Sequence, residues 1–261
     1  MPAGSVHHSL GRACSISLYV NQENVLTQEP LRLPLPLLNS LLASLSEDGV
    51  ARIANNCERV YFSYGDVLYT PGEKVNDIYF PETCLISLLG ILNIRTSLEV
   101  GLIGCEGVVG ISATLGIEKS YVHAVVQAAG SAIKISSAVL LAEVQKSPLL
   151  QFALIEYINR SLAQTIQIAV CSKFHMLEAR LARSLLTTRD HLQSNAFHLT
   201  HETIAHALGV RRVGVTKAAS ALQRQHLISY TRGEIQILDH AGLESVSCEC
   251  YQIIKDIRLA G

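Results

Sequence analysis

The chain contains no tryptophan, only 5% aromatic residues and only 16% charged residues, which is less charge than an average soluble domain carries. It also has no uninterrupted apolar run of eighteen residues, so the sequence predicts no membrane span. The first residues show no charged segment followed by an apolar core, and we therefore expect no signal peptide. With 49% hydrophobic residues in a chain of 261, there is enough apolar material for two buried cores.

The seven cysteines follow neither a disulfide pattern nor the paired C-x-x-C spacing of zinc knuckles, which predicts reduced thiols in a cytoplasmic protein. Cys248 and Cys250 form the one close pair. Such a pair could bind metal or sense redox state, but the interpretation we favour is two ordinary thiols on a terminal helix. We read His7 and His8 as a solvated pair. From the sequence we therefore assign no metal site and no cofactor.

Signatures of catalysis are also missing. We find no arrangement of the Ser–His–Asp kind and no glycine-rich phosphate loop. A metal-dependent enzyme built on a β-barrel needs clustered histidines facing its interior, and only His123 lies in the β-rich part of the chain. We therefore assign no catalytic residue and expect no enzymatic activity.

The most informative stretch that is present runs from Leu199 to Ile237. Thr200 can cap a helix whose apolar positions, such as Ile204 and Leu208, recur at helical spacing. Gly209 then provides a tight corner. A second helix is expected over about residues 212–225, followed by two short strands around a turn. Two helices at a glycine corner followed by a hairpin are typical of a winged helix-turn-helix, whose second helix enters the major groove of DNA.

The distribution of charge along the chain favours a DNA-binding motif over a helical hairpin that binds no ligand. Between His175 and Arg232 there are eight basic and three acidic residues, a net charge of +5, whereas the whole chain has a net charge of −1. The remainder of the chain is therefore acidic. A basic terminal domain on an acidic chain is expected when one domain alone meets phosphate.

The rest of the chain falls into segments of different periodicity. Residues 1–30 are expected to form a loosely ordered arm, and a helix with a leucine stripe is expected over 34–54. Short β-branched runs between turn residues then predict a β-barrel or roll, so we assign residues 31–148 to a roll domain. A long helix is expected over 149–174, and a helix-turn-helix domain over 175–261, with the hinge near Lys173 and Phe174.

The long helix has two apolar stripes, of which a single roll can cover only one. The second stripe therefore predicts a two-fold dimer, with burial within one chain as the alternative. The residues we assign to this dimer helix are Leu154, Ile158, Ser161, Thr165 and Ile168.

Taken in order, these parts resemble the Crp/Fnr family of bacterial transcription regulators. The resemblance rests on Gly65–Tyr69 with Pro71–Glu73, on Glu106–Gly110, and on the helix-turn-helix. It implies an α+β fold, with an N-terminal antiparallel β-roll of the jelly-roll and cyclic-nucleotide-binding-like type flanked by helices, a long dimerisation helix and a C-terminal winged helix-turn-helix. It also implies a cytoplasmic homodimer that binds double-stranded DNA, with RNA polymerase as a further candidate partner.

Members of the family that bind cyclic AMP place a Glu after the glycine that matches Gly110, and an Arg about a dozen residues later. Here Ile111 follows, and residues 120–124 offer no basic side chain except His123. Without a guanidinium the bidentate contact to a phosphate is missing, so we do not expect cyclic-nucleotide sensing. The cysteines and histidines expected for an iron–sulfur or haem sensor are missing as well. The effector stays unassigned, with a candidate pocket at Gly110, Ile111, Ser112 and His123.

The resemblance also assigns DNA contacts. Arg212 and Lys217 match two arginines that face bases, while Val213 replaces a Glu and could touch a thymine methyl. Arg211 stands at the cap of this helix and is assigned to a phosphate. The full assignment is base reading by Arg212, Val213, Thr216 and Lys217, and phosphate binding by Thr200, Arg211 and Arg232. Two alternatives remain, a cyclic-nucleotide-responsive regulator of the same family and a regulatory dimer that does not bind DNA.

Overall fold

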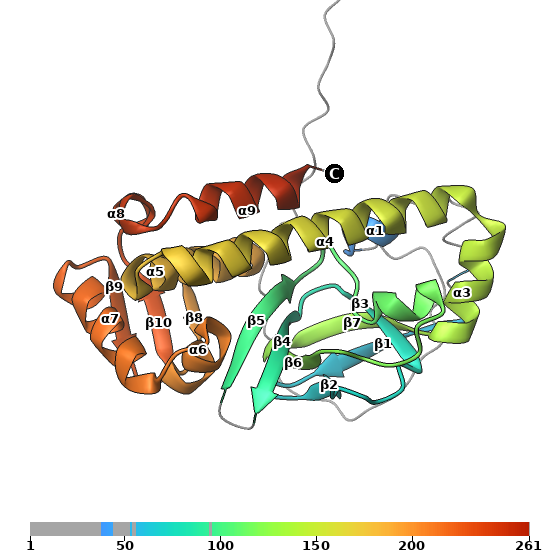
Figure 1. The fold of residues 1–261 in the computed structure, drawn as a ribbon, viewed down its shortest axis with the longest axis horizontal. Helices are drawn as coiled ribbons and strands as arrows, with labels where there is room; N and C mark the ends of the chain where they lie inside the picture. Colours follow the sequence, from blue (N-terminus) through green and yellow to red (C-terminus); the bar gives the residue numbers. More distant parts are fainter. Residues whose placement is uncertain (1–37, 44–52, 54–55, 94–95, 261) are drawn as a thin grey trace, which may run out of the picture.

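The computed structural model describes residues 38–43, 53, 56–93 and 96–260 (Figure 1). The arm expected over residues 1–30 lies outside the described residues, as does most of the helix expected over 34–54. Within that helix the structure describes one turn, α1 (Ser40–Ala43), whose Leu41 and Leu42 are buried. Among the described residues no single helix is long and apolar enough to cross a membrane, although α3 (Ser137–Lys146) and α4 (Pro148–Phe174), bent by 115° at their junction, meet that criterion as a pair.

Two antiparallel sheets form the β-roll. One sheet has the strand order β1-β7-β3 and the other β2-β6-β4-β5. Their inward side chains, including Phe80, Ile86 and Ile133, form one core. The strands are β1 (Cys57–Phe62), β2 (Val67–Tyr69), β3 (Asp77–Pro81), β4 (Leu85–Asn93), β5 (Thr96–Ile103), β6 (His123–Ala128) and β7 (Gly130–Ser136). A short 3-10 helix, η1 (Ile111–Leu115), interrupts the roll between β5 and β6.

Two helices follow the roll, and the N-cap of each is a serine. Ser136 caps α3 (Ser137–Lys146), and Ser147 caps α4 (Pro148–Phe174), where Pro148 occupies the first turn. Helix α4 lies across the roll and continues toward the C-terminal domain (Figure 1). Its Leu150, Leu154 and Tyr157 belong to the roll core, so the roll covers one side of this long helix.

The C-terminal domain has its own core, separate from that of the roll. It contains a three-stranded antiparallel sheet in the order β8-β10-β9. Its elements are α5 (Leu177–Leu192), β8 (Ala196–His198), α6 (His201–Leu208), α7 (Arg212–Arg224), β9 (Ile228–Thr231), β10 (Glu234–Ile237), α8 (His240–Val246) and α9 (Cys250–Leu259). Helix α9 runs back beside α4 (Figure 1).

Three features of this domain differ from what the sequence predicts: the number of strands in its sheet, the helix α8 and the position of the hinge. The hairpin was expected to have two strands, but β8 adds a third because Phe197 pairs with Ile235 and packs into the core. The helix α8 was not expected. The hinge was expected near Lys173 and Phe174, whereas α4 includes both residues and the break falls at His175 and Met176.

Candidate nucleic-acid interface

Helices α6 and α7 meet at a glycine corner. Gly209 follows the last residue of α6 with φ of 65°, in the left-handed region that glycine enters without steric cost. The guanidinium of Arg180, which extends from α5, donates a hydrogen bond to the Leu208 carbonyl at the end of α6. Below the corner, Val215 and Leu222 of α7 pack into the domain core. One face of α7 is thus fixed inward, and the opposite face is directed outward.

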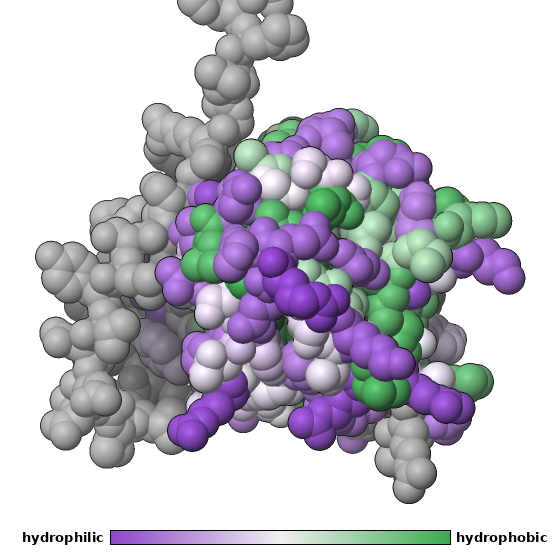
Figure 2. All heavy atoms as spheres, turned by 90° about the vertical axis from the view of Figure 1, so that its left-hand side faces the viewer, coloured by the Kyte–Doolittle hydropathy of each residue, from purple (hydrophilic) through white to green (hydrophobic). Residues whose placement is uncertain are grey.

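The outward face of α7 begins with two arginines. Arg211 occupies the cap position with no capping hydrogen bond from its side chain in the described part of the chain. Arg212, Val213 and Lys217 are exposed. Ser220, one turn beyond Thr216, is also exposed and extends the same face. Figure 2 views the end of the molecule that carries α7, and hydrophilic side chains predominate there. The structure therefore brings the predicted base-reading residues onto one accessible face.

The hydroxyl of Thr216 makes hydrogen bonds with other residues of the domain. Its Oγ1 donates to the Arg212 carbonyl at 3.1 Å and lies 3.1 Å from His201 Nδ1. The His201 ring stacks on Tyr230, with ring centroids 4.1 Å apart. Burial, followed by the charge of Arg212, lowers the pKa of His201 below its ordinary value. His201 therefore orders the middle of the α7 face, a role that the sequence did not identify.

The wing places a basic side chain at its tip. Strands β9 and β10 are joined by Arg232 and Gly233, which have φ of 52° and 91°. Positive φ at both central residues is the geometry of a tight hairpin turn whose twist matches its strands. Arg232 is exposed at this turn.

Thr200 caps α6, as the sequence predicts. Its side-chain oxygen accepts a hydrogen bond from the Thr203 amide at 3.1 Å. We expect Thr200→Ala to lower the free energy of unfolding by about 1 kcal/mol, because one amide at the helix start loses its partner. Urea unfolding of the purified chain measures this change. The control is Thr231→Ala on the exposed wing, and equal losses in the two variants would contradict the capping role.

The roll contacts the helix-turn-helix near this cap. The hydroxyl of Tyr64 lies 2.6 Å from Thr203 Oγ1, and its ring packs edge-on against His198. Further along α6, Ser97 of β5 donates to the His206 carbonyl at 3.0 Å. The roll therefore contacts α6 and β8, whereas the predicted base-reading side chains at the start of α7 stay exposed.

Large apolar side chains are exposed along the whole of α4, interspersed with exposed polar residues such as Glu156 and Asn159. The residues predicted for the dimer contact are on the other side: Leu154 and Ile168 are buried, and Thr165 donates to the Val100 carbonyl of the roll. The apolar stripe that remains exposed is therefore the second one, because the roll already covers the first. Each side chain of the second stripe is more than 40% exposed, and the set comprises Leu149, Phe152, Ile155, Leu162, Ile166, Val170 and Phe174.

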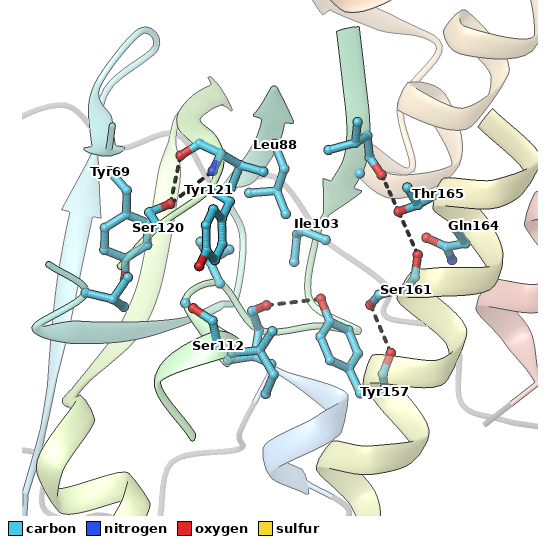
Figure 3. A pocket seen from close by; sticks show the side chains of 18 residues that line it. Tyr69, Leu88, Ile103, Ser112, Ser120, Tyr121, Tyr157, Ser161, Gln164 and Thr165 are labelled. Carbon is cyan, nitrogen blue, oxygen red and sulfur yellow. Dashed lines mark hydrogen bonds between the residues drawn. The ribbon is translucent and has the colours of Figure 1, made fainter. Parts of the chain in front are cut away.

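A cavity of about 270 Å³ lies between the roll and α4 (Figure 3). Gly110, Ile111 and Ser112 line it as the sequence predicts, but His123 is not a lining residue, since it lies on β6 beyond Val122. Helix α4 contributes Tyr157, Ser161, Gln164 and Thr165. The sequence does not predict that these four residues line the cavity, and it assigns Ser161 and Thr165 to the dimer contact instead. They are about fifty residues from Gly110 and meet it only through the packing of α4 on the roll.

The cavity wall carries no charge among the residues that the structure describes. Hydroxyls and one amide, Gln164, are its polar groups, and Tyr157 donates to the Val108 carbonyl at 3.0 Å. A cyclic phosphate is bound most strongly where a cationic side chain, above all an arginine, pairs with its oxygens. The arrangement therefore fits an uncharged molecule better than a cyclic nucleotide.

A second group of side chains lies at the hinge. Cys171 and His175, at the end of α4, meet Cys248 and Cys250, at the start of α9. The sequence singled out Cys248 and Cys250 but not their neighbours. More than seventy residues separate the two pairs, so nothing in the local pattern joins them.

These elements define a winged helix-turn-helix DNA-binding protein whose β-roll is joined to it by a long helix. Residues 179–246 match the Crp-like helix-turn-helix domain. No sequence among the curated proteins matches the chain. The chain therefore carries a Crp-like DNA-binding helix-turn-helix domain, and its fold is similar to that of transcription regulators of the Crp/Fnr family. The predicted α+β fold is confirmed.

Three solved structures illustrate the likeness. A Crp/Fnr-family protein of Eubacterium rectale is 19% identical, with a TM-score of 0.64 over 81% of this chain and 97% of that one. A CRP/FNR-family transcriptional regulator of Thermus thermophilus is 25% identical, with a TM-score of 0.62 over 73% and 98%. The c-di-GMP-responsive global regulator CLP of Xanthomonas campestris is 16% identical, with a TM-score of 0.63 over 74% and 100%.

Proposed function

We propose that this regulator acts in the cytoplasm as a homodimer on a roughly palindromic operator. Each protomer inserts α7 into the major groove, and the two grooves lie about one helical turn apart. The observation that carries the proposal is the exposed basic start of α7, backed by a packed apolar face. In this account residues 31–148 form the sensor, 149–174 the dimer helix and 175–261 the DNA-binding domain.

The side chains of α7 have distinct roles. Arg212 has the donors for a bidentate contact with guanine O6 and N7, and Lys217 reaches a base or a phosphate. Val213 is 60% exposed and touches a thymine methyl. Thr216 supports this set through His201. Phosphates are bound by Arg211, by Arg232 and by Thr200 at the start of α6, and these contacts fix the register of the protein on the duplex.

Arg212→Ala is expected to lower affinity for the operator by about 1–3 kcal/mol and to relax specificity at one base position. Arg211→Ala is expected to weaken cognate and scrambled DNA alike, because a phosphate contact carries no sequence information. Fluorescence anisotropy with both duplexes measures each change. Equal losses on both duplexes in both variants would contradict the assigned roles.

Salt dependence distinguishes this function from a regulatory dimer that does not bind DNA. Contacts to phosphates release counterions, so the affinity should fall steeply as the salt concentration rises. An Arg211→Ala or Arg232→Ala variant should show a shallower slope, by about one counterion for each arginine removed. A salt-independent interaction would favour the protein–protein alternative.

The cavity between the roll and α4 supports an uncharged effector. Its lining includes four residues of α4, so a ligand there contacts the sensor and the dimer helix together. Cyclic nucleotides are the alternative, and calorimetric titration with cyclic AMP and cyclic di-GMP separates the two classes. RNA polymerase is the expected partner on DNA if the regulator activates transcription.

A further inference from the structure

Four potential metal ligands gather where the C-terminal segment returns to the hinge. Cys171 lies in the last turn of α4, and His175 caps that helix. Cys248 lies between α8 and α9, and Cys250 is the first residue of α9. One donor atom from each of the four side chains lies within 4.8 Å of the other three. Two segments far apart in the chain thus contribute two ligands each.

Two of the separations between the donor atoms are close to the edge lengths of a tetrahedral zinc site. Cys171 Sγ and Cys248 Sγ are 3.5 Å apart, and Cys250 Sγ is 3.4 Å from His175 Nδ1. A tetrahedral zinc ion, with bonds of about 2.3 Å to sulfur and 2.0 Å to nitrogen, holds neighbouring ligand atoms about 3.5–3.8 Å apart. A small inward shift of the four side chains would therefore complete the coordination.

The surroundings of the cluster are those of a closed metal site. Cys171, Cys248 and Cys250 are all at most 5% exposed, so the three sulfurs are shielded from bulk water. His175 Nε2 lies 3.2 Å from Glu249 Oε1, which orients Nδ1 toward the cluster in the tautomer that a metal requires. Gln167 Nε2 donates to Cys250 Sγ at 3.0 Å, a bond that stabilises a thiolate.

A buried cationic side chain, Arg183, acts on two of the sulfurs of the cluster. The charge of the Arg183 guanidinium acts on both Cys171 and Cys248. Arg183 is buried, and its Nε has no hydrogen-bond partner among the residues that the structure describes. A buried guanidinium whose charge acts on two of the three sulfurs offsets part of the negative charge that a three-thiolate zinc site carries.

We propose that Cys171, His175, Cys248 and Cys250 bind one structural zinc ion. Each protonated thiol releases its proton to solvent as its sulfur–zinc bond forms, and His175 binds through neutral Nδ1. An iron–sulfur cubane fits less well, because its ligands bind different iron atoms and lie farther apart than these four. A Cys171–Cys248 disulfide would use two of the residues and leave His175 and Cys250 without a role.

The ion would connect α9 to the junction of α4 and α5. The chain between Cys171 and Cys250 contains the whole helix-turn-helix and its wing, so the metal closes a loop around the DNA-binding domain. Closing a long loop stabilises the folded chain by restricting the unfolded one. Removing the metal is therefore expected to lower the Tm by several degrees. The site stands independently of the operator and of the effector.

The test is the metal content of the full-length, untagged protein, purified under reducing conditions and measured by mass spectrometry of the elements. We expect about one zinc ion per chain in the parent protein. Cys250→Ser should abolish this zinc, while Cys57→Ser, a matched change at a half-buried thiol in the roll, should retain it. Zinc that persists at full occupancy in Cys250→Ser would overturn the proposal.

Cobalt titration of the metal-free parent protein keeps the test decisive if Cys250→Ser does not fold. Four-coordinate Co²⁺ with thiolate ligands gives strong visible bands and a near-ultraviolet charge-transfer band, and we expect both. Weak octahedral bands, stoichiometric iron in place of zinc, or a mass lower by two hydrogens after purification under reducing conditions would each contradict the proposal.

Discussion

Replacing Leu162 and Ile166 of α4 with glutamate is expected to convert the proposed homodimer into monomers and to lower operator affinity by about two orders of magnitude or more. Both side chains are more than half exposed in the single chain, at the centre of the apolar stripe. In a dimer they would be buried against their copies, and a buried unpaired carboxylate is strongly unfavourable. A monomer reads one half-site and loses the gain in effective concentration that the second provides.

Analytical ultracentrifugation and anisotropy on a two-half-site duplex measure the two effects together. Leu92→Glu is the matched control, since Leu92 is also an exposed apolar residue but lies on β4, away from α4. This control should remain dimeric and keep its affinity. A double variant that stays dimeric would contradict the assignment of this stripe to the dimer contact.

Leu222→Ala is expected to lower the free energy of unfolding by about 2–5 kcal/mol. Leu222 is fully buried on the inner face of α7, where it packs with the core of the C-terminal domain. Truncation leaves a cavity under the helix that carries the base-reading residues. At temperatures where the domain of the Leu222→Ala variant begins to unfold, its affinity for DNA should fall as well.

Thermal and urea unfolding measure this loss, with Leu238→Ala as the control. Leu238 lies in the same domain and is 53% exposed, so the same chemical change should cost less than about 0.5 kcal/mol. Similar losses in the two variants would show that α7 is not held by the core described for it.

The helix-turn-helix could be predicted from the sequence because its determinants are local. Thr200 supplies a cap, Gly209 supplies a left-handed corner, and the apolar period fixes which face of α7 is inward. The start of α4 is likewise marked by local residues, since Ser147 caps the helix and Pro148 occupies its first turn. Each of these features depends on residues within one or two turns of each other.

Features that depend on distant residues could not be predicted in this way. The sequence shows two apolar stripes on α4, but only the packing of the roll shows which one is covered. Cys171 and His175 join Cys248 and Cys250 only because α9 folds back along α4. Likewise, β8 is a strand because its partner β10 is present, and its three residues carry little signal alone.

Dimeric reading of an operator is most directly tested by selecting duplexes from a random DNA pool with the purified protein and no added effector. We predict enrichment of a two-fold symmetric site whose half-sites lie about one helical turn apart, and loss of one base preference in Arg212→Ala. Enrichment of a single, unpaired half-site would contradict dimeric reading. No enrichment from a dimeric protein, with or without candidate ligands, would contradict the proposed function as a whole.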